Sequence, residues 1–350
     1  ASQFKNCENM IGAVQVPVGV AGPLKISGAH AKGEYYIPLA TTEGALVASV
    51  NRGCKAISQG VGARVCTENA GMTRGCVFKT KGILEGKKLE TWLDKNTAVL
   101  SRVAQKTSSH ISLKQIFTKV VGKSTFVRFS FDTQDAMGMN MVTIATEHIT
   151  RFVEKETGNT CVTIASNFDV DKKPSWLNSI LGRGRQVWAQ ARIPREVVAE
   201  VLKTTPEKID SIAKEKCLIG SAISGSLGQN AHFANMIAAL FLACGQDIAH
   251  TVEGSLGITV TEVIDTGLYI SIHLPDLPIG TVGGGTGLPS QKEMLMLLGC
   301  FGGDGGGNAA KLAEIAGGTV LAGELSLLAA LSSGSLVSAH QKLARPPEYL

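Results

Sequence analysis

The chain has 350 residues, 44% hydrophobic and 18% charged, so it can bury a sizeable core and is long enough for two domains. Its 34 basic and 29 acidic residues give a net charge of +5, and this mild, scattered excess suits an anionic small ligand and argues against a nucleic-acid-binding protein. The eight cysteines form no Cys-x-x-Cys pair and no zinc-like Cys/His spacing, so we expect reduced thiols, a cytoplasmic setting and no metal site.

The sequence predicts no membrane segment. Its longest apolar run, Met236 to Cys244, is far shorter than the roughly 20 residues that a membrane span needs, and no signal peptide is visible. Because the chain opens at Ala1 without a methionine, a missing upstream segment, a membrane anchor included, stays open.

The first 60 residues predict short strands and then a helix. The strand-like runs are Ala13 to Leu24 and Tyr35 to Ala40, interrupted by prolines and glycines that favour edge pairing. The segment Thr41-Thr42-Glu43-Gly44 predicts a helix start, with threonine as the N-cap and Glu43 in the first turn. Glu43 would either complement the helix dipole or place a carboxyl at a strand-to-helix junction, where active sites often lie.

Residues 76–165 predict a separate module. Its expected elements are strand Cys76 to Lys81, helix Leu89 to Lys106, strands His110 to Val121 and Thr125 to Phe131, helix Met137 to Glu156, and strand Thr160 to Ala165. This βαββαβ order is that of the ferredoxin-like unit, whose ends lie close together, so we expect an insertion in a larger domain. Asp135 is a good N-cap for the second helix, where a phosphate could bind, whereas no Gly-x-Gly-x-x-Gly supports a Rossmann fold.

The segment Asp171-Lys172-Lys173-Pro174 combines an acid, two lysines and a proline in a mostly apolar chain. A lone charge run is usually a solvated turn. An apolar run precedes this one, however, and small and basic residues follow it, which favours a site of fixed positive charge. We therefore expect Lys172 or Lys173 to meet a developing negative charge on a substrate.

The last 150 residues predict mainly helices. The expected helices are Pro194 to Lys203, Pro206 to Lys216, a central buried one from about Ala231 to Glu253, Ala309 to Ala316 and Val320 to Leu331; the expected strands are Ile258 to Val263 and Leu268 to His273. Glycine loops cover Gly280 to Thr286 and Gly302 to Gly307. Asp247 interrupts the central helix, so it needs either structural hydrogen bonds or a role in pairing a lysine or handling a proton. Asn235 lies twelve residues earlier, about 120° round an ideal helix, so spacing does not place the two in one site.

These motifs together resemble the catalytic region of 3-hydroxy-3-methylglutaryl-coenzyme A (HMG-CoA) reductases of the NADPH-using biosynthetic class I, most like the soluble archaeal members. The resemblance runs from Glu8 to about His340. It is carried by Glu8 to Gly12, Thr42 to Gly44, Asn51 to Gly53, Met72 to Gly75, Asp135 to Asn140, Asp171 to Pro174, Gly245 to Asp247, Gly280 to Thr286, and Ser338 to His340.

The resemblance implies an α+β fold: a large mixed α/β domain around a central buried helix, with an inserted ferredoxin-like NADP(H)-binding domain. The large substrate domain, with the dimerisation segment, would cover residues 1–75 and 166–340, the small domain 76–165, and a tail 341–350. The implied reaction is the four-electron reduction of (S)-HMG-CoA to (R)-mevalonate and coenzyme A with two NADPH, in isoprenoid biosynthesis. A mevaldyl-CoA hemithioacetal would collapse to mevaldehyde before the second reduction.

The resemblance also implies residue roles. Lys172 would steady the oxyanion, Glu43 would donate a proton in the aldehyde step with a raised pKa, Asp247 would pair with both, His340 would protonate the coenzyme A thiolate, and Asn235 would orient the lysine. The hydroxymethylglutaryl end would contact Arg74, Asp171, Lys173 and Lys216, and coenzyme A would contact Asn51, Arg52, Lys203 and His232. The cofactor would contact Ser101, Arg102, Asp135, Met137, Gly138, Met139, Asn140, Gly283, Gly284, Gly285 and Thr286.

The chain departs from the family pattern at three positions. Ala165 replaces a substrate-contacting serine, for which Ser166 could compensate. Asp132 stands where many eukaryotic members carry a basic residue, which weakens the case for strict NADPH preference. Pro346 replaces the serine used in eukaryotic phosphoserine control.

The family shares its active site between subunits, so the resemblance implies a homodimer or a dimer of dimers and an inactive monomer. Three alternatives to this function remain: the NADH-preferring degradative class, a coenzyme A-thioester-binding protein without catalysis, and a Schiff-base enzyme centred on Lys172.

Overall fold

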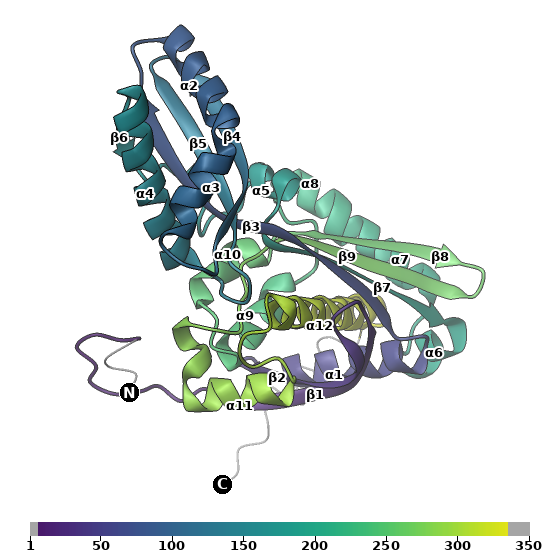
Figure 1. The fold of residues 1–350 in the computed structure, drawn as a ribbon. Helices are drawn as coiled ribbons and strands as arrows, with labels where there is room; N and C mark the ends of the chain where they lie inside the picture. Colours follow the sequence, from purple (N-terminus) through teal and green to yellow (C-terminus); the bar gives the residue numbers. More distant parts are fainter. Residues whose placement is uncertain (1–5, 335–350) are drawn as a thin grey trace.

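The structure, a computed structural model of the chain, describes residues 6–334. Figure 1 shows a small unit, residues 72–163, that stands above a large unit formed by the rest of the described chain. Each unit has its own cluster of buried apolar side chains. All eight cysteines are free thiols.

A mixed sheet forms one wall of the large unit, with strand order β2-β1-β3-β7-β9-β8. Its strands are β1 (Val18–Ser27), β2 (Lys32–Ala40), β3 (Ala63–Lys79), β7 (Arg183–Pro194), β8 (Ile258–Ile264) and β9 (Gly267–Leu277). The pairs are antiparallel except for a short parallel contact between β1 and β3. The two expected N-terminal strands therefore exist, although the first begins five residues later than predicted.

Strand β3 is much longer than the predicted Cys76 to Lys81, and it joins the two units. Up to Gly71 it pairs with β7, and from Met72 onward it pairs with β5 and β6 of the small unit. The change occurs at Gly71, whose φ of 87° and shifted register turn the strand from one sheet into the other. One strand therefore fixes the position of the small unit above the large one (Figure 1).

The small unit has the predicted order of elements, with one correction. Beside β3 it contains α2 (Ile83–Lys95), α3 (Thr97–Gln105), β4 (Ser112–Val121), β5 (Ser124–Asp132), α4 (Met139–Thr157) and β6 (Thr160–Thr163), and its strand order is β6-β3-β5-β4. The single helix expected from Leu89 to Lys106 is wrong. Asn96 divides it, because its side-chain amide donates to the Trp92 carbonyl at 2.7 Å and ends α2 there.

The helices of the large unit pack on one another and on the sheet. They are α1 (Leu46–Gln59), α5 (Trp176–Leu181), α6 (Arg195–Glu200), α7 (Pro206–Ala213), a π-helix (Lys214–Gly220), α8 (Ser221–Ser224), α9 (Phe233–Ala243), α10 (Thr251–Gly254), α11 (Pro289–Leu297), α12 (Gly307–Ser332), and the 3₁₀ turns Ile248–His250 and Gly284–Gly287. Strand β7 was not predicted, although Val187, Ala189, Ala191 and Ile193 alternate inward along it, which is the signal for a strand.

The central buried helix is α12, not the predicted Ala231 to Glu253. The two predicted helices Ala309 to Ala316 and Val320 to Leu331 are both part of α12, which continues through Gly317 and Gly318. A side chain at Gly317 would overlap Val187 of β7, and one at Gly318 would press on Ile26 of β1. These glycines let the helix lie close to the sheet. Although α12 is long and apolar enough to cross a bilayer, 83% of its most apolar window is buried, as in a core helix.

Candidate active site

Lys172 and Asp247 form an ion pair with 3.0 Å between Nζ and Oδ2. Helix α9 ends at Ala243 because Gly245, at φ 68°, breaks it, and this break carries Asp247 out of the helix. Asp247 is therefore not buried as predicted, since 38% of its side chain is exposed. The remaining burial raises its pKa, but hydrogen bonds from Lys172 and Ala249, with the charge of His250, outweigh it and hold the pKa below the ordinary value.

Glu43 and Asn235 form a second pair, in which the Asn235 amide donates to Glu43 Oε1 at 3.2 Å. The predicted N-cap threonine is wrong: α1 begins at Leu46 with Ala45 as an uncapped N-cap, so Glu43 precedes the helix. Thr41 instead accepts a hydrogen bond from the Glu43 amide at 3.0 Å.

Helix α12 holds the start of α9, and therefore Asn235. The buried carboxylate of Glu324 accepts from the amides of Ala231 at 2.8 Å and His232 at 2.7 Å, and from the Thr259 hydroxyl at 2.6 Å. Among residues 6–334, none of the hydrogen bonds or ion pairs joins Glu43 to Lys172 or Asp247, and Asn235 contacts Glu43 rather than the lysine.

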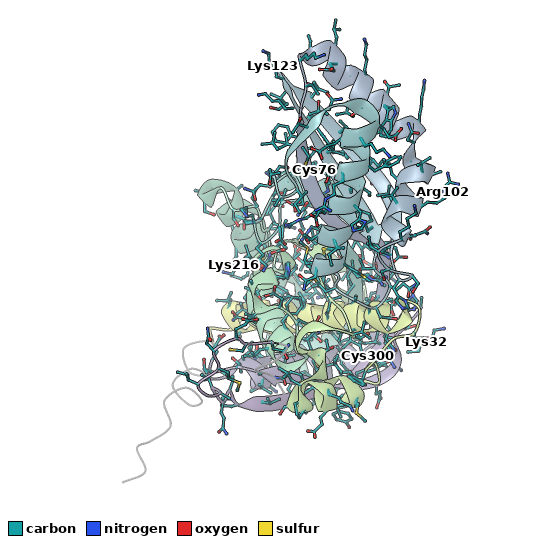
Figure 2. All side chains as sticks on the ribbon, turned by 60° about the vertical axis from the view of Figure 1, so that its left-hand side comes forward. Lys32, Cys76, Arg102, Lys123, Lys216 and Cys300 are labelled. Carbon is teal, nitrogen blue, oxygen red and sulfur yellow. The ribbon has the colours of Figure 1, made fainter. Side chains whose placement is uncertain are left out.

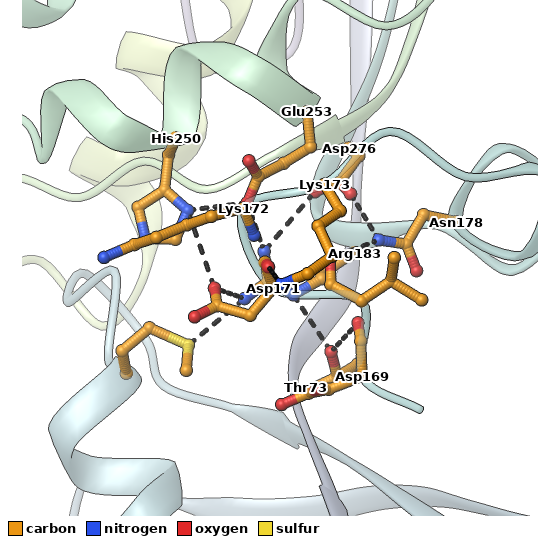
Figure 3. Close-up of polar contacts among 12 residues, drawn as sticks. Thr73, Asp169, Asp171, Lys172, Lys173, Asn178, Arg183, His250, Glu253 and Asp276 are labelled. Atoms are coloured by element: carbon orange, nitrogen blue, oxygen red, sulfur yellow. Dashed lines mark hydrogen bonds and ion pairs between the residues drawn. The ribbon is translucent and has the colours of Figure 1, made fainter. Parts of the chain in front are cut away.

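A buried ionic network lies behind Lys172 (Figure 3). Its centre is Arg183, fully buried, which donates to Glu253 Oε1 at 2.8 Å, Asp171 Oδ1 at 2.7 Å and the Thr73 hydroxyl at 3.0 Å. Burial alone would lower the pKa of Arg183, but Asp276, Asp171 and Glu253 together raise it. The sequence predicts that the basic residues after Pro174 face an anionic ligand, whereas Arg183 pairs with carboxylates of the chain itself.

Asp276 closes the far side of this network. Burial raises its pKa to about 7, against the opposing effect of Arg183, and its Oδ2 accepts from the Asn178 amide at 2.6 Å. Asn178 in turn accepts from the buried guanidinium of Arg128 at 2.6 Å. Glu253, Asp276 and Arg128 were not predicted, since nothing in their local sequence separates them from ordinary helix and strand residues.

The residues expected at the hydroxymethylglutaryl end lie around the Lys172 loop. Arg74 pairs with the buried Asp169 at 3.4 Å, and the exposed Lys173 donates to the Asp171 carbonyl at 3.0 Å. Lys216 lines a cavity of about 830 Å³ together with Pro174 and His232. This cavity therefore lies between the Lys172 loop and the start of α9.

The residues expected to contact coenzyme A are mostly engaged within the chain. Asn51 accepts from the Gly22 amide at 2.9 Å, and Arg52 donates to the Ser326 hydroxyl at 3.0 Å and carbonyl at 2.6 Å. His232 contacts the Gly323 carbonyl at 2.9 Å through Nε2. Lys203 is exposed and has a left-handed backbone with φ 58°.

The segments expected to bind the cofactor come together at the junction of the two units. The Thr281 amide donates to the Asp135 carbonyl at 2.8 Å, and Ala136 and Val282 form a parallel bridge, so the Asp135 to Asn140 motif lies beside the Gly283 to Thr286 loop. Figure 2 shows Arg102 at the surface of the small unit, on α3 beside the half-buried Ser101. From the motif, Met139 reaches Arg183, with 3.2 Å between Sδ and the guanidinium.

Asp135 does not cap the helix that follows it. Helix α4 begins at Met139 with Gly138 as its N-cap, at φ 93° and without a capping side chain. The buried Asp135 carboxylate instead accepts from the amides of Asp304, Gly306 and Ala309 at 2.5–2.8 Å, which caps the start of α12. The first amides of α4 are therefore left for another acceptor.

The remaining positions named from the sequence are His340 and two positions at which the chain departs from the family pattern. His340 lies outside the described residues. Ser166 donates to the Gly75 carbonyl at 3.1 Å beside the exposed Ala165. The Asp132 carboxylate accepts from the Asn69 amide at 2.9 Å and the Gln134 backbone at 2.8 Å.

Known proteins resemble the chain over nearly its full length. The family model described as hydroxymethylglutaryl-coenzyme A reductase matches residues 2–345. The chain is 53% identical over 347 residues to 3-hydroxy-3-methylglutaryl-coenzyme A reductase of Methanocaldococcus jannaschii, covering 97% of this chain and 85% of that protein. The corresponding protein of Haloferax volcanii is 51% identical over 340 residues, with 97% and 84% covered.

Solved structures share the fold. A class II 3-hydroxy-3-methylglutaryl-CoA reductase from Streptococcus pneumoniae, bound to NADPH in open conformations, superposes with a TM-score of 0.74 at 21% identity. The match covers 94% of this chain and 88% of that one.

Proposed function

The chain belongs to the hydroxymethylglutaryl-coenzyme A reductase family, and from that premise we propose how its residues divide the work of reducing HMG-CoA to mevalonate. The enzyme is an oxidoreductase of the mevalonate pathway. We assign residues 76–165 as the NADP(H)-binding domain, residues 1–75 and 166–340 as the substrate domain, and 341–350 as a tail. The separate apolar clusters of the two units support this division.

The residues at the junction of the two units fit NADPH, which supplies hydride when bound. The uncapped first turn of α4 offers backbone amides to a phosphate, and Gly283 and Gly284 leave open space where a side chain would stand. Arg102 is exposed and suits a further phosphate. The carboxylate of Asp135 is saturated by the start of α12, so we assign it the task of holding the motif in place. Equal rates with NADH and NADPH would show that the enzyme does not prefer NADPH, the outcome that Asp132 favours.

Lys172 is the residue we assign to the substrate oxygen that becomes negative as hydride arrives. Its ammonium is fixed by Asp247 at 3.0 Å and stays partly exposed, two residues before Pro174, which lines the 830 Å³ cavity, and this observation carries the proposal. A preorganised cation stabilises a developing oxyanion more than mobile water does. Glu43, held by Asn235, is assigned a proton transfer to that oxygen in the aldehyde step, and His340 the protonation of the coenzyme A thiolate.

The substrate contacts follow the positions of the remaining groups. We assign the hydroxymethylglutaryl carboxylate to Lys173 and Lys216, with Arg74 and Asp171 behind them. The coenzyme A portion is assigned to Lys203 and to the exposed edges of Asn51, Arg52 and His232, whose existing hydrogen bonds would keep them rigid.

NADPH oxidation in the presence of HMG-CoA tests this proposal. Lys172→Ala should lower kcat by about 10²–10³-fold, because the oxyanion loses its preorganised donor. Lys208→Ala removes an exposed lysine on α7 and should leave the rate unchanged. Equal rates for the parent and Lys172→Ala would overturn the assignment.

We also propose an assembly of two or four chains with shared active sites. Two observations support it. Among residues 6–334, no hydrogen bond or ion pair joins the Glu43–Asn235 pair to the Lys172–Asp247 pair, and in the segment Glu8 to Gly12 the apolar Ile11 is fully exposed. Ile11→Asp should then shift the protein toward monomers in sedimentation and lower activity in parallel. Val121→Asp, at an exposed apolar position on β4, is the control. A folded monomer with full turnover would refute the shared site.

A cytoplasmic location is also a proposal. It is supported by the burial of α12, the one helix of residues 6–334 that is long and apolar enough to span a bilayer. Recovery of the protein in the membrane fraction of its cell would contradict it.

A further inference from the structure

His250 is fully buried and lies next to Asp247, the carboxylate that pairs with Lys172, although the proposed reaction assigns it no role. Its Nδ1 lies 2.6 Å from Glu253 Oε1, and its Nε2 lies 3.5 Å from Asp247 Oδ2, the same oxygen that meets Lys172 Nζ. The imidazole therefore connects a buried carboxylate to one in the active site.

The carboxylates around His250 define the role of its two ring nitrogens. An ionised carboxylate only accepts hydrogen bonds, so a ring nitrogen that contacts one must carry the proton. Nδ1 faces Glu253 Oε1, and Nε2, which has no other partner among the described residues, faces Asp247 Oδ2, so we assign an N–H donor to both positions. The third carboxylate near the ring is Asp171, whose Oδ1 lies 3.8 Å from Nδ1 and is held by Arg183.

Glu253 also fixes the other half of the pair. The Lys172 amide donates to Glu253 Oε1 at 3.1 Å, and Lys172 has a left-handed backbone with φ 56°. Such a conformation is strained in a residue with a side chain, so it needs surrounding contacts to persist. Glu253 thus restrains Lys172 through its backbone and Asp247 through His250.

A metal site is the alternative interpretation of this cluster, because Asp171, His250 and Glu253 offer three ligand atoms within 4.8 Å of one another. The guanidinium of Arg183 already lies 2.7–2.8 Å from the oxygens of Asp171 and Glu253. A cation there would have to displace a buried arginine, so the geometry favours a hydrogen-bonded network without a metal.

We propose that His250 is a positioning residue of the reductase: it holds the Asp247 carboxylate toward Lys172 Nζ, and Glu253 holds both His250 and the Lys172 backbone. The inference rests on the roles proposed above for Lys172 and Asp247. The 3.5 Å contact is long, as catalytic contacts often are before substrate binds, and we expect it to shorten in the complex with HMG-CoA.

Two amide substitutions separate this role from a purely structural one. In His250→Gln the side-chain amide reaches the position of Nε2 and keeps the contact with Asp247. In His250→Asn the amide reaches the position of Nδ1 and keeps only the contact with Glu253. We expect His250→Gln to retain kcat within about threefold, and His250→Asn to lose at least about tenfold, or about 1.4 kcal/mol, with the KM for HMG-CoA unchanged.

The outcomes are distinct. A His250→Asn rate at or above that of His250→Gln would overturn the inference, because the Glu253 contact alone would then account for the histidine. Lys172→Ala is measured in the same assay. If Lys172→Ala is active, the proposed function fails; if it is inactive and both His250 variants match the parent, only the role of His250 fails.

If the His250 variants do not fold, the contact is tested by a measurement that keeps His250 in place. The ¹⁵N resonance of His250 Nε2 is compared between the parent and Asp247→Asn in the full-length protein. We expect it to move, because the charged neighbour of Nε2 is lost. An unchanged resonance would refute the contact.

Discussion

Arg183→Met is expected to destabilise the protein strongly, because it removes the cation from a fully buried network. In the native protein the guanidinium lies 2.8 Å from Glu253 and 2.7 Å from Asp171, and the Glu253 side chain has no exposed surface. Methionine has a similar volume but no charge, so Glu253 would remain buried without its counter-ion. Breaking a buried pair in this way costs about 3–5 kcal/mol. At about 2 °C per kcal/mol for a large domain, the thermal midpoint should fall by about 6–10 °C.

The assay is thermal unfolding, followed by circular dichroism, of Arg183→Met and of Arg195→Met as a matched control. Arg195 also pairs with a carboxylate, Glu207, at 2.6 Å, but both side chains are about half exposed. Such a surface pair contributes about 0–1 kcal/mol, so the control should shift by no more than about 2 °C. Glu253→Gln added to Arg183→Met should recover part of the loss. Equal midpoints for the two single variants would show that the network is not stabilised by its charges.

Three further outcomes follow from the structure. Burial raises the pKa of Asp276 to about 7, so its stabilising effect is complete below about pH 4 and is lost as the pH rises to about 7. Asp276→Asn should therefore flatten the change in thermal midpoint between about pH 4 and 7, and an unchanged slope would contradict the raised pKa. Gly245→Ala should lower kcat more than Gly158→Ala. Both glycines have a left-handed backbone, but only at Gly245 would a side chain overlap a neighbour, the Gly285 carbonyl, and so displace Asp247. Equal effects on kcat would argue against this displacement. Asp135→Ala should lower the free energy of unfolding by about 1–2 kcal/mol, because α12 loses its cap, and the control Asp304→Ala should lower it less. An unchanged thermal midpoint with weaker NADPH binding would assign the Asp135 carboxylate to the cofactor instead.

Local patterns predicted the small unit well. Its strands and helices have strong periodicity, and their order appears in the structure with only the division at Asn96 added. The errors are at places where distant packing overrides local preference. Gly317 and Gly318 interrupt a helical pattern, yet the helix continues because β1 and β7 press against them. Gly245 ends a helix whose apolar pattern seemed to continue to Glu253.

The resemblance named residues from separate segments, and the structure determined which of them touch. Lys172 meets Asp247, whereas Glu43 meets Asn235, and within one chain these are two pairs rather than one cluster. Asp135 has the sequence of a local helix cap but caps α12, more than 160 residues away. Nothing in the spacing of these residues encodes such partners.

From the sequence alone came the order of elements in the small unit and the prediction of which segments carry the lysine, the carboxylates and the glycine loops of the candidate site. The buried network that Arg183, Glu253 and His250 form behind Lys172 is visible only in the tertiary structure. Glu253 lies 70 positions from Arg183 and 81 from Lys172, and the local sequence of His250, three positions away, is ordinary. Periodicity reports which face of an element is buried. Charge pairing depends on which elements the fold brings together, and that is decided by long-range packing such as the two-sheet strand β3.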